Sequence, residues 1–405
     1  MAAKSSVKRI ETESGVRLGM TQHSRLPFKL DEYRRRYDHV MNLMKAAGAD
    51  VLLVRSPENI TYLTGYETPG YYGYHCLVVA RGEQPVLVGR KLEIVTNAPE
   101  FSWLTKIVPV QDHEDPVQRT IDTVKKLKME RKGIGLEKSC WFFTANEYDQ
   151  VKDALPKGKF VDCSKVIEEA RMVKSEPEVG MIKQAVAIAD KACLAGIKAT
   201  KPGVSEDQIA GALHKVWCEE GAEFTGLPNF IVSGRRSGAC HATWRGRKMA
   251  KNDHCIFEIA ASKNRYCGAV FRTATVGNPR AKVRKIFDAT KEALEAAIAE
   301  IRPGVSAEKV DKAGRDIIKA HGFGQHHHHR LGYSIGINYP PDWGEGQIIS
   351  IRKGEKRLLQ ENMTFHLVPG CLIFDDMGLV TSNSVRVTAN GCEVLNSIPR
   401  KLFEN

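Results

Sequence analysis

No hydrophobic run in this sequence is long enough to cross a bilayer. Apolar runs such as Val51–Val54 cover a few residues, whereas a membrane-spanning helix needs about 20. Residues 1–19 mix Lys and Arg with Glu and have no apolar stretch, unlike a secretory signal. We therefore expect a cytoplasmic protein with no membrane partner. We interpret residues 1–25 as a flexible N-terminal tail, with organelle targeting as the alternative.

The sequence contains no C-x-x-C pair among its 10 cysteines, which are scattered through apolar stretches. This distribution is typical of reduced, buried thiols and argues against a disulfide framework or a zinc motif. The sequence also contains no nucleic-acid-binding motif, although its net charge is +12. Because Lys and Arg alternate with Asp and Glu along the chain, we expect a solvated surface and no nucleic-acid partner.

A chain of 405 residues exceeds a single hydrophobic core, which predicts two domains. An amphipathic helix over 33–47 is followed by short strands over 50–54, 76–80 and 84–89, a pattern that predicts a small α/β domain. A charged, proline-containing segment, residues 170–179, then leads into a long helix. We place the boundary there, with an N-terminal domain over 26–172 and a second domain over 173–405.

The second domain carries an internal duplication. The sequence Lys201-Pro-Gly-Val-Ser205 is repeated as Arg302-Pro-Gly-Val-Ser306, each copy following an Ala-rich helical stretch. Pro-Gly ends a helix and Ser begins the next, and Ser205 with Gln208 has the form of a capping box. Two halves of this kind, related by a pseudo-twofold axis, predict one α+β domain with a cleft between them.

Several further motifs lie between the two copies of this repeat or after the second copy. They are His241-Ala-Thr-Trp244, Phe257-Glu-Ile-Ala-Ala261, Phe271-Arg-Thr273 and His329-Arg-Leu-Gly-Tyr-Ser-Ile-Gly336. Together with the repeat, they resemble the pita-bread peptidase family, which includes methionine aminopeptidase, prolidase, aminopeptidase P and creatinase. The resemblance covers nearly the whole chain. It implies a creatinase-type α/β N-terminal domain, an α+β pita-bread domain with a pseudo-twofold repeat, and a homodimer.

Within this family the chain most resembles the ectoine hydrolases. The matching stretches include Asn59-Ile-Thr-Tyr-Leu-Thr-Gly-Tyr66, Tyr339-Pro-Pro-Asp-Trp-Gly-Glu345 and Asn362-Met-Thr-Phe-His366. This resemblance implies a hydrolase that acts on a small zwitterion.

The family resemblance also implies where a metal pair would lie, because the peptidases hold two divalent ions with two Asp, one His and two Glu. In this sequence those positions are Glu258, Ala269, Tyr333, Val368 and Asn383, or Ser382 if the register shifts by one. One carboxylate and no imidazole remain, and Ala and Val cannot ligate a metal. We therefore expect no dinuclear metal site and no cofactor. Creatinase, another member of the family, works without metal. The resemblance therefore allows catalysis without the metal pair.

Glu258 and His241 are the candidate catalytic residues. Glu258 lies in a mostly apolar strand, where burial should raise the pKa of its carboxyl into the range of a general base. The alternative is a structural acid paired with Arg272. His241 occupies the position where the family places a substrate-contacting, proton-shuttling histidine, the alternative being an ordinary loop histidine.

The candidate substrate-binding residues surround these two in the family pattern. Glu345 and Trp343 would hold a cationic group, by charge and by a cation–π contact; Glu345 is otherwise a turn acid facing solvent. Tyr333 would donate to a substrate carboxylate or oxyanion, or else pack against its neighbouring glycines. Arg272 and Phe271 would line the same pocket.

Two other clusters lie outside this group. Tyr72, in an aromatic loop, packs against its own strands or forms a substrate lid that reaches the partner subunit of a dimer. The run His326–His329 cannot converge on one tetrahedral ion. We expect it to be a loop with only His329 near the cleft.

These residues lead to the hypothesis of a metal-independent hydrolase that cleaves a C–N bond in an amidine- or guanidine-like substrate. Phe271, Met377, Val380 and Asn383 depart from the ectoine hydrolase pattern, which leaves the identity of the substrate open. One alternative is a divergent metal-dependent Xaa-Pro peptidase or a dimethylsulfoniopropionate-lyase-like enzyme. Another is a non-catalytic pseudo-peptidase that binds a partner in the former cleft.

Overall fold

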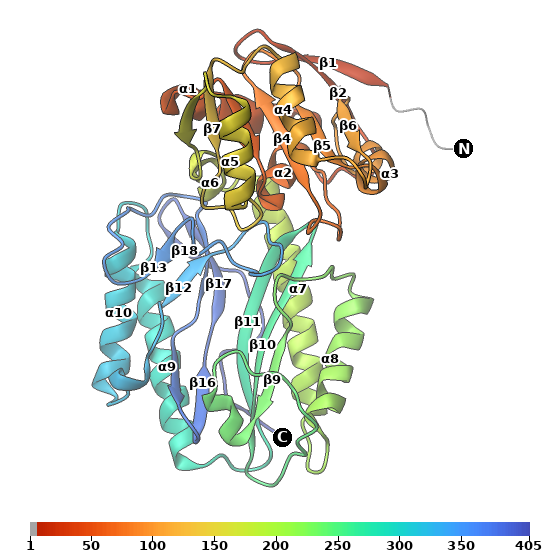
Figure 1. Cartoon of the computed structure of the whole chain (residues 1–405). Helices are drawn as coiled ribbons and strands as arrows, with labels where there is room; N and C mark the ends of the chain where they lie inside the picture. Colours follow the sequence, from red (N-terminus) through yellow and green to blue (C-terminus); the bar gives the residue numbers. More distant parts are fainter. Residues whose placement is uncertain (1–5) are drawn as a thin grey trace. The chain divides into compact units, whose positions relative to one another are not determined.

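The computed structural model describes residues 6–405, which divide into two compact units (Figure 1). The first unit ends at Arg171 and the second comprises Met172–Asn405. No helix in the described part of the chain has the length and apolar character to span a membrane.

The first unit is built on a six-stranded mixed sheet with the strand order β6-β5-β4-β3-β7-β8. Its strands are β3 (Val51–Val54), β4 (His75–Ala80), β5 (Val86–Arg90), β6 (Ile107–Val110), β7 (Gly133–Leu136) and β8 (Lys159–Asp162). Its helices are α1 (Leu30–Ala47), α2 (Pro57–Thr64), α3 (Lys91–Phe101), α4 (Pro116–Lys126), α5 (Ala145–Ala154) and α6 (Val166–Met172). The predicted α/β architecture is confirmed, and β4 pairs with β5 in the antiparallel sense.

The interpretation of residues 1–25 as a flexible tail is wrong for its described part, residues 6–25; residues 1–5 lie outside the described residues. Two antiparallel strands form there, β1 (Val7–Glu11) and β2 (Arg17–Thr21). Met20 is fully buried, and the Gln84 amide exchanges two hydrogen bonds, of 2.8 and 2.9 Å, with the backbone of Gly19. Charged residues in both strands interrupt the alternation of apolar and polar side chains from which strands are predicted.

The second unit shows the predicted duplication as two helix pairs, each followed by strands. The helices are α7 (Glu176–Ala199), α8 (Glu206–Glu219), α9 (Ala281–Glu300) and α10 (Ala307–Ala320). Ser205 caps α8 in a complete capping box with Gln208, and Ser306 caps α10 in the same position of the repeat. Figure 1 shows the pairs α7/α8 and α9/α10 on opposite sides of the strands of this unit.

Two sheets and a hairpin fill the space between these helix pairs. The first sheet has the order β19-β11-β10-β9, the second β13-β12-β14-β17-β18, and β15 pairs with β16 alone. Their bounds are β9 (Phe230–Ser233), β10 (His254–Lys263), β11 (Tyr266–Thr275), β12 (Gly332–Ser334), β13 (Ser350–Ile351), β14 (Thr364–Leu367), β15 (Gly370–Ile373), β16 (Met377–Val380), β17 (Asn383–Thr388), β18 (Gly391–Val394) and β19 (Phe403–Glu404).

The two sheets are joined where β17 crosses β11. The Ser384 hydroxyl accepts from the backbone N–H of Ala269 at 3.1 Å and donates to its carbonyl at 2.9 Å. Each sheet packs its other face on its own helix pair through a separate apolar core. The faces turned toward the other sheet therefore carry the residues of the candidate site.

Candidate active site

Glu258 lies near the middle of β10, directly opposite Phe230 of β9 and Phe271 of β11. All its strand neighbours from His254 to Ser262 are buried, whereas Glu258 is only half-buried. Its carboxylate makes no hydrogen bond and no ion pair with any residue in 6–405. An acid without a partner is costly in such a setting, so its retention points to a chemical role.

The surroundings of Glu258 raise the pKa of its carboxyl to about 8, first through burial among apolar groups and second through the negative charge of Asp342. The free protein therefore holds this carboxyl largely protonated at neutral pH. Asp342 is not among the predicted site residues, although it directly precedes Trp343. No local pattern indicates that its charge will lie near β10.

Arg272 does not pair with Glu258. Its Cα lies opposite Phe257, one position along β11, so its side chain leaves the sheet on the other face. The guanidinium is buried and donates to four carbonyls, those of Phe271, Ser382, Ile398 and Pro399. The proposed ion pair with Glu258 is wrong, and the expected contact of Arg272 with a substrate does not agree with this geometry, because its N–H groups fasten the C-terminal segment instead.

Aromatic residues lie opposite Glu258 on both neighbouring strands. Phe230 stacks on His241 with ring centroids 5.3 Å apart and meets Trp343 edge-on at 5.5 Å. Phe271 is buried on the same face of the sheet as Glu258. Phe271 and Trp343 therefore lie near Glu258, and their contact with a substrate stays a prediction.

His241 is exposed and adopts a left-handed backbone conformation with φ of 55°. Its ring lies nearly parallel to Phe230, and within residues 6–405 the imidazole has no hydrogen-bond partner. Its predicted role as a proton shuttle stays a prediction. The imidazole contacts Phe230, and Phe230 lies directly opposite Glu258 in the sheet.

Tyr333 is buried and belongs to a chain of side-chain hydrogen bonds. The Trp343 indole Nε1 donates to Tyr333 Oη at 2.9 Å, and Tyr333 Oη lies 2.9 Å from His366 Nδ1. His366 Nε2 lies 2.7 Å from Ser382 Oγ. Burial, followed by the negative charge of Glu258, raises the pKa of Tyr333. The loop packs closely here, since a Cβ on Gly344 would lie 2.6 Å from the Tyr333 ring.

Glu345 forms a buried ion pair with Lys174, with Nζ and Oε2 2.7 Å apart and both side chains no more than 1 % exposed. The backbone N–H of Ile337 donates to its other oxygen at 3.1 Å. The expected contact between Glu345 and a cationic substrate, and the alternative of a solvent-facing acid, both disagree with this arrangement. No local pattern indicates Lys174 as the partner, because it lies far from Glu345 along the chain.

The strand register decides between Ser382 and Asn383 at the last position of the family's metal set. Tyr333 pairs with His366 and His366 with Ser384, so Ser382 lies on the same face as Tyr333. Asn383 pairs with Leu367 and lies on the opposite face, toward the core under α9 and α10. The shifted register is the correct one.

The residues at the five family positions do not fit a metal pair. They are Glu258, Ala269, Tyr333, Val368 and Ser382, of which only Glu258 offers a carboxylate. Across residues 6–405, no three His, Cys, Asp or Glu side chains are grouped so as to hold a metal ion. Family chemistry that depends on two bridged metals therefore has no ligand set within the described residues.

The histidine run forms a loop around η2 (Gly324–His326). His327 is buried and its Nδ1 lies 2.8 Å from the Gly370 carbonyl oxygen, while its ring packs 4.9 Å from that of His329. Burial lowers the pKa of His329 to about 4. Neither imidazole forms a hydrogen bond with the residues around Glu258.

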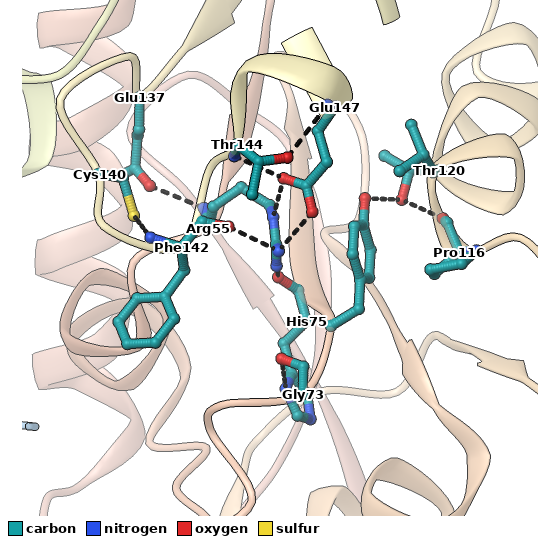
Figure 2. Close-up of polar contacts among 12 residues, drawn as sticks. Arg55, Gly73, His75, Pro116, Thr120, Glu137, Cys140, Phe142, Thr144 and Glu147 are labelled. Carbon is teal, nitrogen blue, oxygen red and sulfur yellow. Dashed lines mark hydrogen bonds and ion pairs between the residues drawn. The ribbon is translucent and has the colours of Figure 1, made fainter. Parts of the chain in front are cut away.

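A second cluster of buried charge lies in the first unit and is fully used by the fold (Figure 2). Arg55 pairs with Glu147 at 3.1 Å and donates to the carbonyls of His75 and Phe142. Glu137 accepts from the backbone N–H groups of Arg55 and Ser56. These groups connect β3 to its neighbours and leave no donor aimed at a ligand. Tyr72, in the same unit, is 76 % exposed, and its role as a lid stays a prediction.

Comparisons with known proteins agree with this architecture. The model of metallopeptidase family M24 matches residues 180–389, and that of the creatinase/prolidase N-terminal domain matches residues 36–173. The chain belongs to metallopeptidase family M24. It is an enzyme of the hydrolase class that acts on carbon–nitrogen bonds.

Individual relatives cover nearly the whole chain. An ectoine hydrolase from Halomonas elongata is 28% identical over 93% of this chain and 98% of its own. An uncharacterized hydrolase/peptidase from Sinorhizobium fredii, y4tL, is 32% identical over 93% and 97%. The prolidase from Thermococcus sibiricus is 26% identical, covers 93% of this chain and 100% of its own, and has a TM-score of 0.83. The predicted family and fold are therefore confirmed.

Proposed function

We propose that this protein is a metal-independent hydrolase that cleaves a C–N bond in a small zwitterion with an amidine- or guanidine-like carbon, as its similarity to ectoine hydrolase suggests. One observation carries the proposal: a half-buried carboxylate without a protein partner, Glu258, lies among aromatic rings at the position where the family holds its metals.

The surroundings of Glu258 suit a cationic substrate. Asp342 adds a second negative charge, and Phe230, Phe271 and Trp343 supply aromatic surface. A cation that binds beside Glu258 favours the ionised carboxylate and lowers its pKa from about 8. Substrate binding would therefore release the proton and prepare the base for catalysis.

The carboxylate would then act as general base and general acid in turn. Glu258 takes a proton from a water molecule as the water oxygen attacks the amidinium carbon, which gives a tetrahedral intermediate. The same proton passes to the departing nitrogen as the C–N bond breaks and the carbonyl forms. His241, whose side chain is exposed, would exchange protons with solvent.

The direct test is to incubate the purified protein with ectoine and to follow ring opening by chromatography, beside Glu258→Gln. Glu219→Gln, at an exposed end of α8, is the matched control. We expect turnover by the wild type and the control, and a loss of about 100-fold or more in Glu258→Gln. Absence of turnover, or full activity in Glu258→Gln, would reject the proposal.

The similarity to Xaa-Pro dipeptidases, such as the one from Lactobacillus helveticus, supports a metal-dependent peptidase as the second candidate. Elemental analysis after dialysis against a chelator separates the two. Stoichiometric Mn, Zn or Fe with cleavage of Xaa-Pro dipeptides would favour the peptidase. A non-catalytic binding protein would show neither activity.

We also propose a homodimer in which Tyr72 contributes to the partner's site. Light scattering would measure the oligomeric state, and Tyr72→Ala would raise KM more than it lowers kcat. A monomeric enzyme with full activity would contradict this arrangement.

A further inference from the structure

The hydrogen-bond chain from Trp343 to Ser382 has a fixed direction. An indole Nε1–H can only donate, so Tyr333 Oη accepts from Trp343 at 2.9 Å. Among residues 6–405, His366 Nδ1, 2.9 Å from that oxygen, is the only acceptor within hydrogen-bond distance of the buried phenol, so the phenol proton is directed there. Nδ1 must accept, so the proton of the neutral imidazole is on Nε2 and is donated to Ser382 Oγ at 2.7 Å.

The neutral form of His366 is favoured on physical grounds. The side chain is fully buried, and the nearby Arg272 guanidinium disfavours a second cation. Burial, followed by the charge of Arg272, lowers the pKa of His366 to about 3. A neutral imidazole with its proton on Nε2 is therefore the state that this chain of contacts requires near neutral pH.

This direction determines what Tyr333 can offer to a ligand. Its proton is already donated to His366, so the phenol oxygen has only a lone pair left for another group. The predicted donation by Tyr333 to a substrate carboxylate or oxyanion therefore conflicts with this network. Once Glu258 is ionised, its negative charge, which acts on the same phenol, also favours an N–H donor over an anion.

We propose that His366 is a positioning residue that holds Tyr333 as a hydrogen-bond acceptor, so that this part of the site selects N–H groups of a cationic ligand and rejects carboxylates and oxyanions. The inference rests on the proposed function for the identity of the substrate. The preference for N–H donors is a property of binding alone and can be measured without turnover.

Two substitutions separate the two sides of the imidazole. His366→Asn places an amide oxygen where Nδ1 lies, which preserves the acceptor for Tyr333. His366→Gln places its amide near Nε2, which preserves the donor to Ser382 but frees the Tyr333 proton. Both variants remove the ring, so they are matched for the loss of packing.

The experiment is titration calorimetry of the full chain with acetamidinium and, separately, with acetate. We expect His366→Gln to bind acetamidinium about tenfold or more weakly than the wild type, since a hydrogen bond to a charged group contributes about this factor. The same variant should gain affinity for acetate, and His366→Asn should resemble the wild type. Circular dichroism confirms folding of each variant.

Equal losses in both variants would show a purely structural role and overturn the proposal. Unchanged acetamidinium binding in His366→Gln, or no binding by the wild type, would overturn it as well. If the binding pattern holds but ectoine is not hydrolysed, the proposed function fails while the selection of N–H donors stands.

Discussion

Replacing Glu258 by Gln should stabilise the protein, and the gain should depend on pH. Its pKa of about 8 in the folded chain lies well above its ordinary value of 4.5. Between these two values the folded state holds a proton that the unfolded state has lost. The raised pKa therefore costs the wild type no unfolding free energy below about pH 4.5. Its unfolding free energy then falls as the pH rises toward 8.

The magnitude follows from the size of the shift. Each pH unit within the window corresponds to about 1.4 kcal/mol. At pH 7 the shift by this measure lowers the unfolding free energy of the wild type by about 3 kcal/mol relative to its value below pH 4.5, and partial exposure of the side chain reduces this loss to about 2 kcal/mol. Gln has nearly the same shape and no charge, so the variant avoids this cost.

The assay is denaturant unfolding of both proteins at several pH values between 4.5 and 9, with Glu219→Gln as control. The difference in unfolding free energy between Glu258→Gln and the wild type should be near zero at the acidic end. It should grow through neutral pH and level off above about pH 8. A difference independent of pH, or a wild type more stable than the variant at pH 8, would refute the account of Glu258 as an unpaired acid.

Three further predictions follow from the site. The kcat/KM of the wild type should rise with pH and level off above about 8, because the free enzyme must lose the Glu258 proton; a flat profile between pH 6 and 8 would contradict this. Glu345→Gln should cost about 3–5 kcal/mol in chemical denaturation because it leaves the Lys174 cation buried and unpaired, whereas Glu345→Gln combined with Lys174→Met should cost less; equal costs would argue against the ion pair. Dialysis against EDTA should leave ectoine hydrolysis within about twofold of the untreated enzyme, because only one of the five family metal positions holds a carboxylate; restoration of lost activity by Mn²⁺ would contradict it.

The elements of the fold that could be predicted are those with local signals. The repeated Pro-Gly-Val-Ser sequence locates the caps of α8 and α10, because a serine hydroxyl satisfies the free N–H groups of the next helix wherever it occurs. The apolar run around Glu258 predicts a buried strand, and the structure has β10 there. Both features depend on a few consecutive residues.

The features that could not be predicted depend on long-range contacts. The hairpin of β1 and β2 is held by Gln84, which nothing in the sequence of the hairpin indicates. The residues next to Glu345 in the sequence do not indicate whether its side chain faces solvent or pairs with Lys174. The choice between Ser382 and Asn383 required the pairing of β14 with β17, since a shift of one residue exchanges the two faces of a strand.

The duplicated architecture of the second unit has a consequence for how its chemistry is divided. Glu258 and Phe271 come from the sheet that follows α7 and α8, whereas Tyr333, His366 and Ser382 come from the sheet next to α9 and α10. Two identical subunits related by a twofold axis would have to present every group twice. Because the two halves share one polypeptide, mutation can place an acid on one sheet and an oriented imidazole on the other. A substrate with one charged end requires this asymmetry.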